Sequence, residues 1–175
     1  QKAIAFELLQ DLDWEPPDWI VLPGGNLGNV SAFFKALREL RELRLIDRYP
    51  RLAVIQADGA SPLYRAYRPG GAFERGDDLE PVPGARTIAS AIRIGAPVSW
   101  PKARQAIDAT DGIVETVTDQ QIMDAKAWVD AAGIGAEPAS CASVAGTHKL
   151  VTSGRVATEA SVVCILTGHL LKDPD

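Results

Sequence analysis

The segment Trp19-Ile-Val-Leu-Pro-Gly-Gly-Asn-Leu-Gly-Asn29 combines an apolar run with a glycine-rich turn, and it decides the fold predicted for this chain. Its first four residues form a short apolar run between Asp18 and Pro23, which is typical of a buried strand. A glycine-rich turn follows, and from there to about residue 45 apolar side chains recur at helical spacing opposite a charged face. The sequence therefore predicts a strand, a tight turn and a helix in that order.

This order suits an anion, because the first N–H groups of a helix have no partner within it and lie at the positive end of its dipole. Gly25 and Gly28 let the backbone approach a ligand, and Asn26 and Asn29 add side-chain amides. The spacing matches neither a P-loop nor a dinucleotide fingerprint. A plain turn with an Asn helix cap is an equally good interpretation. If the turn holds phosphate, a bulky residue at Gly25 or Gly28 is expected to abolish binding and spare the fold.

Composition limits the functional classes. The chain has 175 residues, 46% of them apolar and 23% charged, which fits one domain or a large part of a two-domain protein. A net charge of −5 without a basic stripe argues against a nucleic-acid partner. No run is long enough to span a bilayer and no secretory signal is present, so we expect a cytoplasmic location and no membrane partner.

The two cysteines, Cys141 and Cys164, lack metal-ligand spacing, so we expect buried free thiols and no metal site. A helical pattern is already running at Gln1, and the chain stops just past its last strand. We therefore expect a piece of a longer protein.

Helices and strands alternate along the chain. Strands are expected at 19–22, 51–57, 112–117 and 161–166, the last being the most apolar; helices are expected at 1–12, 28–45, 97–109, from Ser61-Pro62, from Thr118, and after 140 to about Gly154. Residues 68–86 form a long irregular excursion. Alternation predicts an α/β fold with a mostly parallel sheet covered by helices on both faces. Ligands bind at the carboxyl ends of such strands, so 23–29 and 167–169 should share one edge.

Five segments together resemble threonine synthases: residues 23–29, 87–95, 112–115, 137–140 and Leu166-Thr-Gly-His-Leu-Leu-Lys-Asp-Pro174. They occur in the family's order and cover nearly the whole chain. The last motif is more typical of threonine synthases than of the related dehydratases or cysteine synthases. Leu170 stands where the family usually has glycine, which implies a small repacking near the ring pocket.

The resemblance implies a fold-type-II enzyme dependent on pyridoxal 5'-phosphate, with residues 1–175 as part of its large, three-layer, tryptophan-synthase-β-like domain. Such an enzyme converts O-phospho-L-homoserine and water into L-threonine and phosphate, and a homodimer is compatible with it. The resemblance also implies that the turn contacts the cofactor phosphate, that Thr167 contacts the ring nitrogen, and that three positions, one of them in the turn, contact the substrate. The turn residues are Gly24, Gly25, Asn26, Leu27, Gly28 and Asn29, and the substrate positions are Asn29, Ala89 and Ser90.

The family's Schiff-base lysine lies in a Ser-x-Lys-Asp-Arg-like motif upstream of the matching region. This chain has no such motif, because Lys172-Asp173 is followed by Pro174 and belongs to the terminal motif. We therefore expect no catalytic residue here, a missing smaller domain, and no turnover by the chain alone.

Two other functions stay open. One is a serine/threonine dehydratase or another β-eliminating relative, and the other is a non-catalytic anion-binding module. Among single residues, His169 is interpreted as a structural hydrogen-bonding group and Glu137 as a helix cap or a carboxylate near the ring. Cys164 is expected in the core, with Trp128 and Met123 on the apolar side of their helix.

Overall fold

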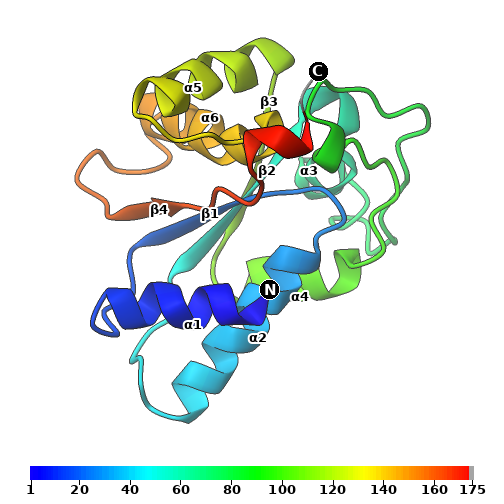
Figure 1. Cartoon of the computed structure of the whole chain (residues 1–175). Helices are drawn as coiled ribbons and strands as arrows, with labels where there is room; N and C mark the ends of the chain where they lie inside the picture. The colour runs from blue at the N-terminus through cyan, green and yellow to red at the C-terminus, as the bar shows by residue number, and fades with distance from the viewer. Residues whose placement is uncertain (174–175) are drawn as a thin grey trace.

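The computed structural model describes residues 1–173, so Pro174 of the terminal motif lies outside the described residues. Its centre is one parallel sheet with the strand order β3-β2-β1-β4 (Figure 1). The strands are β1 (Trp19–Pro23), β2 (Arg51–Ala57), β3 (Ile113–Val117) and β4 (Val162–Cys164). At the amino end, the carboxylate of Asp18 accepts hydrogen bonds from the backbone and hydroxyl of Ser161, which fixes β1 and β4 against each other.

Helices cover both faces of this sheet. They are α1 (Lys2–Asp11), α2 (Gly28–Glu42), α3 (Pro62–Tyr67), α4 (Trp100–Ala109), α5 (Asp119–Ala131) and α6 (Pro138–Thr152), with 3₁₀ turns η1 (Asp58–Ala60), η2 (Ser90–Ile92) and η3 (Leu170–Lys172). Helices α1, α2 and α4 lie on one side, and α6 lies on the other with α5 outside it (Figure 1). Alternate residues of β1 belong to different cores, Ile20 to the first and Val21 to the second. The predicted three-layer α/β architecture is confirmed.

Two helices show why the sequence folds this way. On α2, Val30, Phe33 and Leu37 are buried at helical spacing, and the helix ends at Glu42, before the predicted residue 45. On α6, a side chain at Gly146 would collide with Ile55 of β2. The glycine therefore lets an alanine- and serine-rich helix lie directly on the sheet.

The structure corrects three expectations about burial. Strand β4 has only three residues, all half-buried, where the most apolar strand was predicted over 161–166, because it pairs with β1 alone among the described residues. Cys164 in it is consequently only partly buried. On α5, Met123 and Trp128 are 42% and 50% exposed, because this helix packs on α6 and buries only a narrow stripe.

The first turns of α5 and α3 are stabilised in different ways. The helix predicted from Thr118 begins there, and Thr118 and Gln121 form a capping box. Ser61 occupies the N-cap position of α3, but its hydroxyl donates to the carbonyl of Asp58 and accepts no bond from the helix. The excursion at 68–86 contains no helix or strand, as predicted, but it is anchored by Phe73, whose ring stacks on Trp100 at 5.5 Å. Within residues 1–173, no helix combines the length and apolar character needed to cross a bilayer.

Candidate functional site

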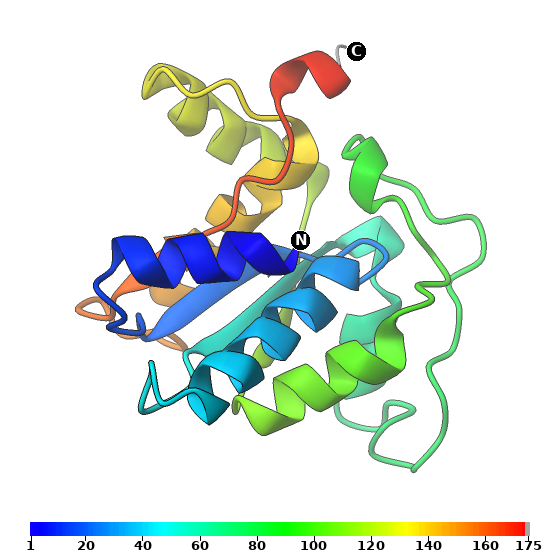
Figure 2. The ribbon, with the colours of Figure 1, turned by 60° about the horizontal axis from the view of Figure 1, so that its bottom comes forward.

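The carboxyl edge of the sheet has a crevice where the direction of the connections changes. The turn after β1 leads into α2 on one face, whereas the chain after β4 runs back toward α6 on the other (Figure 2). The two strands are neighbours, with Val21 opposite Cys164 and the N–H of Ile165 donating to the Val21 carbonyl at 2.9 Å. Gly24 and Thr167 each lie three residues beyond this pair, so they share one edge. Open parallel sheets bind ligands at such reversals.

The turn presents a row of backbone donors. The N–H of Gly24 is used, because it donates to the Ile55 carbonyl at 2.7 Å. The next five N–H groups, at 25–29, donate to no protein acceptor in the part of the chain that the structure describes. Gly25 and Leu27 are nonetheless buried, and buried N–H groups without acceptors are rare in native structures. Leu27 has a left-handed φ of 64° just before α2, a conformation found in anion-binding turns. This donor set fits a phosphate group.

The three glycines of the turn serve different purposes. A Cβ at Gly24 would lie 2.7 Å from Cγ1 of Val54, and one at Gly25 would lie 2.8 Å from the carbonyl oxygen of Ala91. Only Gly28 faces open space, with the Gln1 side chain at 3.6 Å. The expectation that Gly25 could be enlarged without harm to the fold is therefore wrong, because its neighbour is backbone.

A residue that sequence reasoning missed supports the turn. Gln56 of β2 is fully buried, its Nε2 donates to the Gly24 carbonyl at 3.0 Å, and its Oε1 accepts from the N–H of Tyr64 at 3.0 Å. It thereby ties the turn to the first residues of α3. The signal was present as one amide in the otherwise apolar strand 52–57.

The two asparagines have different surroundings. Asn26 is exposed, and its Oδ1 accepts from the N–H of Val98 at 2.8 Å, which positions the segment before α4. Asn29 lies in the first turn of α2, and its side chain has no hydrogen bond within residues 1–173. The residue at the N-cap is Leu27, so the alternative of an Asn helix cap is wrong.

A second segment closes over the turn. The Ala91 carbonyl packs on Gly25, and Ala89 beside it is fully buried, as the small side chains predicted. The hydroxyl of Ser90 is exposed and donates to the Asp173 carboxylate at 2.7 Å. The structure therefore brings 89–90 to the same edge as 24–29.

Thr167 is held from α6. The N–H of Gly168 donates to Oγ of Ser140 at 2.8 Å, and that Oγ lies 3.1 Å from Oγ1 of Thr167. Thr167 itself is exposed. Next to it, Nδ1 of His169 accepts from the N–H of Leu171 at 3.2 Å, a local structural contact of the predicted kind.

Glu137 occupies the N-cap position of α6, as predicted, and its carbonyl accepts from the N–H groups of Ser140 and Cys141, but its side chain accepts no hydrogen bond from the first turn. Its carboxylate packs against Gly168, where a Cβ would collide with it, and the residue is only 6% exposed. Burial raises the pKa of this carboxyl, with Lys172 opposing the shift and Asp173 adding to it. The capping prediction is thus confirmed for the position and not for the side chain, whose carboxylate is buried next to Gly168 instead.

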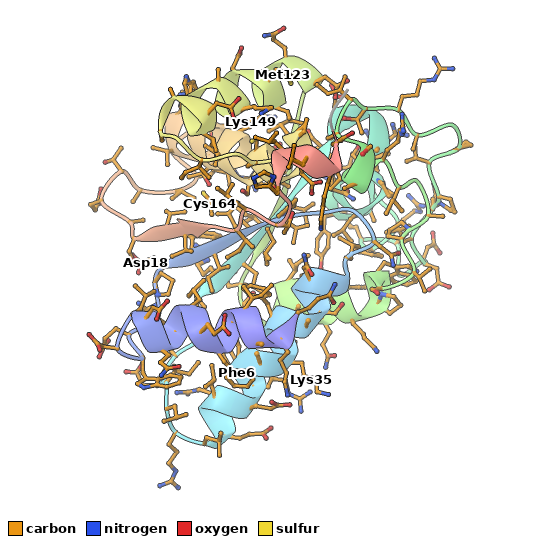
Figure 3. The ribbon with its side chains drawn as sticks, in the orientation of Figure 1. Phe6, Asp18, Lys35, Met123, Lys149 and Cys164 are labelled. Carbon is orange, nitrogen blue, oxygen red and sulfur yellow. The ribbon has the colours of Figure 1, made fainter. Side chains whose placement is uncertain are left out.

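A groove of about 580 Å³ lies elsewhere, between α2, α4 and the first residue of the chain. It is lined by Lys35, Arg38 and Lys102 and touches the turn only at Gly28; Figure 3 shows Lys35 on the outer side of α2. Within residues 1–173, no group of three His, Cys, Asp or Glu side chains is arranged to hold a metal ion.

A comparison with known protein families shows which family the chain belongs to. A family model described as "Pyridoxal-phosphate dependent enzyme" matches residues 1–168. The chain belongs to the family of pyridoxal-phosphate-dependent enzymes. The cofactor of this family is pyridoxal phosphate, whose phosphate group is the kind of anion that the turn can accept.

Within the family, the chain is 46% identical over its whole length to the threonine synthase of Methanocaldococcus jannaschii, of which it covers 42%. It is 42% identical over its whole length to the threonine synthase of Mycobacterium bovis, of which it covers 45%. The chain therefore spans less than half the length of these relatives.

Solved structures share the fold at low identity. An L-serine ammonia-lyase from Rhizomucor miehei superposes with a TM-score of 0.75 at 19% identity, over 99% of this chain and 54% of that one. The processed form of threonine deaminase isoform 2 from Solanum lycopersicum gives 0.73 at 16% identity, over 96% and 42%. These likenesses establish the fold-type-II α/β architecture.

Proposed function

We propose that this chain is the cofactor-holding part of a threonine synthase, which converts O-phospho-L-homoserine and water into L-threonine and phosphate. The observation that carries the proposal is the row of five N–H groups at 25–29, without acceptors among the described residues, on the same sheet edge as Thr167. The choice of reaction is supported by the names of the relatives and by the motif at 166–174.

In this proposal the N–H groups of 25–29 bind the cofactor phosphate, assisted by the positive end of the α2 dipole. Gln56 and the Ala91 carbonyl hold the turn in shape, so the donors are oriented before the ligand arrives. When bound, pyridoxal phosphate supplies an electron sink for bonds next to the amino group of the substrate.

Thr167 would meet the ring nitrogen through its hydroxyl. A neutral hydroxyl, unlike a carboxylate, does not hold a proton on that nitrogen, which moderates the electron sink. On the substrate side, the Asn29 amide would bind the second phosphate, and Ala89 and Ser90 would border the space for the substrate chain; their place on the same edge as the turn supports this. Because the Ser90 hydroxyl already donates to Asp173, we assign it packing and an acceptor role.

The rest of the proposal concerns the longer protein. The lysine that carries the cofactor and the smaller domain would come from sequence upstream of this chain, and the enzyme would act on a small molecule in the cytoplasm. A homodimer is the assembly we expect, without a nucleic-acid or membrane partner.

The test is an assay of the full-length parent with two substrates. Phosphate release from O-phosphohomoserine, together with threonine formation, is the expected result. Ammonia and 2-oxobutanoate from threonine would instead support the alternative of a dehydratase, which the threonine deaminase and serine ammonia-lyase structures keep open.

A non-catalytic anion-binding module is the remaining alternative. The gene separates it from the enzyme: an open reading frame that starts at Gln1, with no lysine motif upstream, would leave only phosphate binding by the turn.

A further inference from the structure

Ser140 stands out among the polar groups of the sheet edge. It is fully buried in the first turn of α6, and its Oγ contacts three atoms of the segment after β4. Its Oγ accepts from the Gly168 N–H at 2.8 Å and lies 3.1 Å from the Thr167 hydroxyl and 3.2 Å from the Gly168 carbonyl oxygen.

The Ser140 hydroxyl has more neighbouring acceptors than protons. A serine hydroxyl has a single proton to donate, so it can serve Thr167 or the Gly168 carbonyl at one time. That carbonyl already accepts from the N–H of Glu137 at 3.0 Å. Thr167 Oγ1 has no other protein donor within residues 1–173. The Ser140 hydroxyl can donate to the second lone pair of that carbonyl at 3.2 Å or to Thr167 at 3.1 Å. We assign its proton to Thr167, because that oxygen is the nearer one and the carbonyl already has a donor.

The direction of this bond decides what Thr167 can do. When Ser140 donates to Oγ1 of Thr167, the proton of Thr167 is free to point into the crevice and donate to an unprotonated ring nitrogen. When Thr167 donates to Ser140 instead, it can only accept at the ring, which requires a protonated nitrogen. Ser140 also lies at the positive end of the α6 dipole, which disfavours a positive charge nearby.

We propose that Ser140 is a positioning residue that turns the Thr167 hydroxyl outward as a donor, and so keeps the ring nitrogen of the cofactor unprotonated. This inference rests on the proposed role of Thr167. Ser140 touches neither cofactor nor substrate in it, and acts only through Thr167.

The test uses the full-length holoenzyme reconstituted with pyridoxal phosphate carrying ¹⁵N at the ring nitrogen. In Ser140→Ala, we expect the ring ¹⁵N resonance to move away from its wild-type position. We also expect the dissociation constant for pyridoxal phosphate to rise about three- to tenfold, the range for one lost neutral hydrogen bond.

The matched control is Ser143→Ala. Ser143 is also fully buried on α6, and its hydroxyl donates to the Ser140 carbonyl at 2.8 Å, with Thr167 outside its contacts. This variant should lose a comparable hydrogen bond and leave the ring resonance in place. A resonance that moves equally in both variants would mean a general loosening of α6 and would overturn the inference.

Thr167→Val separates the inference from the proposed function. If this variant leaves the ring resonance unchanged, Thr167 does not meet the ring, and both ideas fail. If it moves the resonance while Ser140→Ala does not, only the role of Ser140 fails. The double variant should give the same ring resonance as Thr167→Val alone, because Ser140 has nothing left to orient.

If Ser140→Ala does not fold, Ser140→Cys replaces it. The thiol is a weaker donor and should give an intermediate shift of the ring resonance, and a wild-type resonance would refute the inference.

Discussion

At the scale of single residues, the turn at 24–29 combines three kinds of constraint. Gly24 and Gly25 are limited by neighbouring atoms, Gly28 has space around it, and Leu27 adopts a left-handed conformation without being glycine. Such a conformation costs about 1–2 kcal/mol for a residue with a side chain. Leu27 is buried in the first core, so packing offsets that strain and fixes the start of α2.

Alanine substitutions should separate these constraints. Gly25→Ala places a methyl group against the Ala91 carbonyl, and we expect it to lower the free energy of unfolding by about 1–3 kcal/mol. Gly28→Ala should change it by less than about 0.5 kcal/mol, because the site is open and helical. Urea denaturation measures both values, and equal losses would contradict the packing argument.

Glu137 makes stability depend on pH. Because burial raises the pKa of its carboxyl above the ordinary 4.5, the folded state holds the proton more tightly than the unfolded state. Its contribution is therefore fully present below pH 4.5 and is lost as the pH rises through the folded-state pKa. Glu137→Gln has no such proton to lose, so its stability relative to wild type should rise as the pH increases above 4.5 and through the raised pKa of the Glu137 carboxyl.

Denaturation curves at several pH values check this dependence. Glu7→Gln, at an exposed carboxylate on α1, is the control for the substitution itself. If the difference in stability between Glu137→Gln and wild type does not change with pH, the carboxylate is as well solvated in the folded protein as in the unfolded chain.

At the scale of elements, an ion-pair cluster joins β3 to α6. The buried Glu115 carboxylate accepts from Lys149 at 3.0 Å and from Arg155 at 2.7 Å, and Lys149 also donates to the Thr116 carbonyl at 2.7 Å. Figure 3 shows Lys149 on α6, the helix that carries Ser140 at its other end. The cluster therefore helps to fix the helix that holds Thr167.

Glu115→Ala is expected to lower the free energy of unfolding by about 2–3 kcal/mol, because it removes both pairs from a buried position. Arg155→Ala should cost about 0.5–1 kcal/mol, since Arg155 is largely exposed and Glu115 keeps Lys149. Thermal or urea unfolding distinguishes the two. A larger loss from Arg155 than from Glu115 would show that burial of the carboxylate is not the dominant factor.

At the scale of the whole molecule, one segment bridges the carboxyl edge. Thr87 donates its hydroxyl to the carboxylate of Asp119, and the N–H of Ile88 donates to the same group. From there the chain reaches η2, whose backbone packs on Gly25. The bridge thus links the start of α5 to the proposed phosphate turn.

Thr87→Val keeps the shape of the side chain and removes its hydroxyl. We expect faster amide hydrogen exchange in 88–92 and weaker binding of pyridoxal phosphate by the full-length enzyme, because the turn loses its cover. Thr118→Ala, which removes only the cap of α5, is the control and should leave exchange in 88–92 unchanged. Unchanged exchange in Thr87→Val would mean that the Ile88 N–H alone secures the bridge.

Much of the fold was predictable because its signals are local. The apolar run at 19–22, the helical spacing after it and the Thr118–Gln121 capping box each lie within a few turns of chain. Burial on β4 and α5 was predicted wrongly, because apolar residues there indicate a face without telling how much of it a neighbour covers.

The sequence by itself determined the alternation of strands and helices, the glycine-rich turn with its donors, and the motifs that carry the family resemblance. The sequence also predicted that the turn and Thr167 share one edge, but only the tertiary structure decided that their strands are direct neighbours, and that Gln56, Ser140 and Glu137 are the groups that support them. The physical reason is the sheet order: β1 and β4 are neighbours although more than a hundred residues separate them, and side-chain periodicity carries no information about which strands pair.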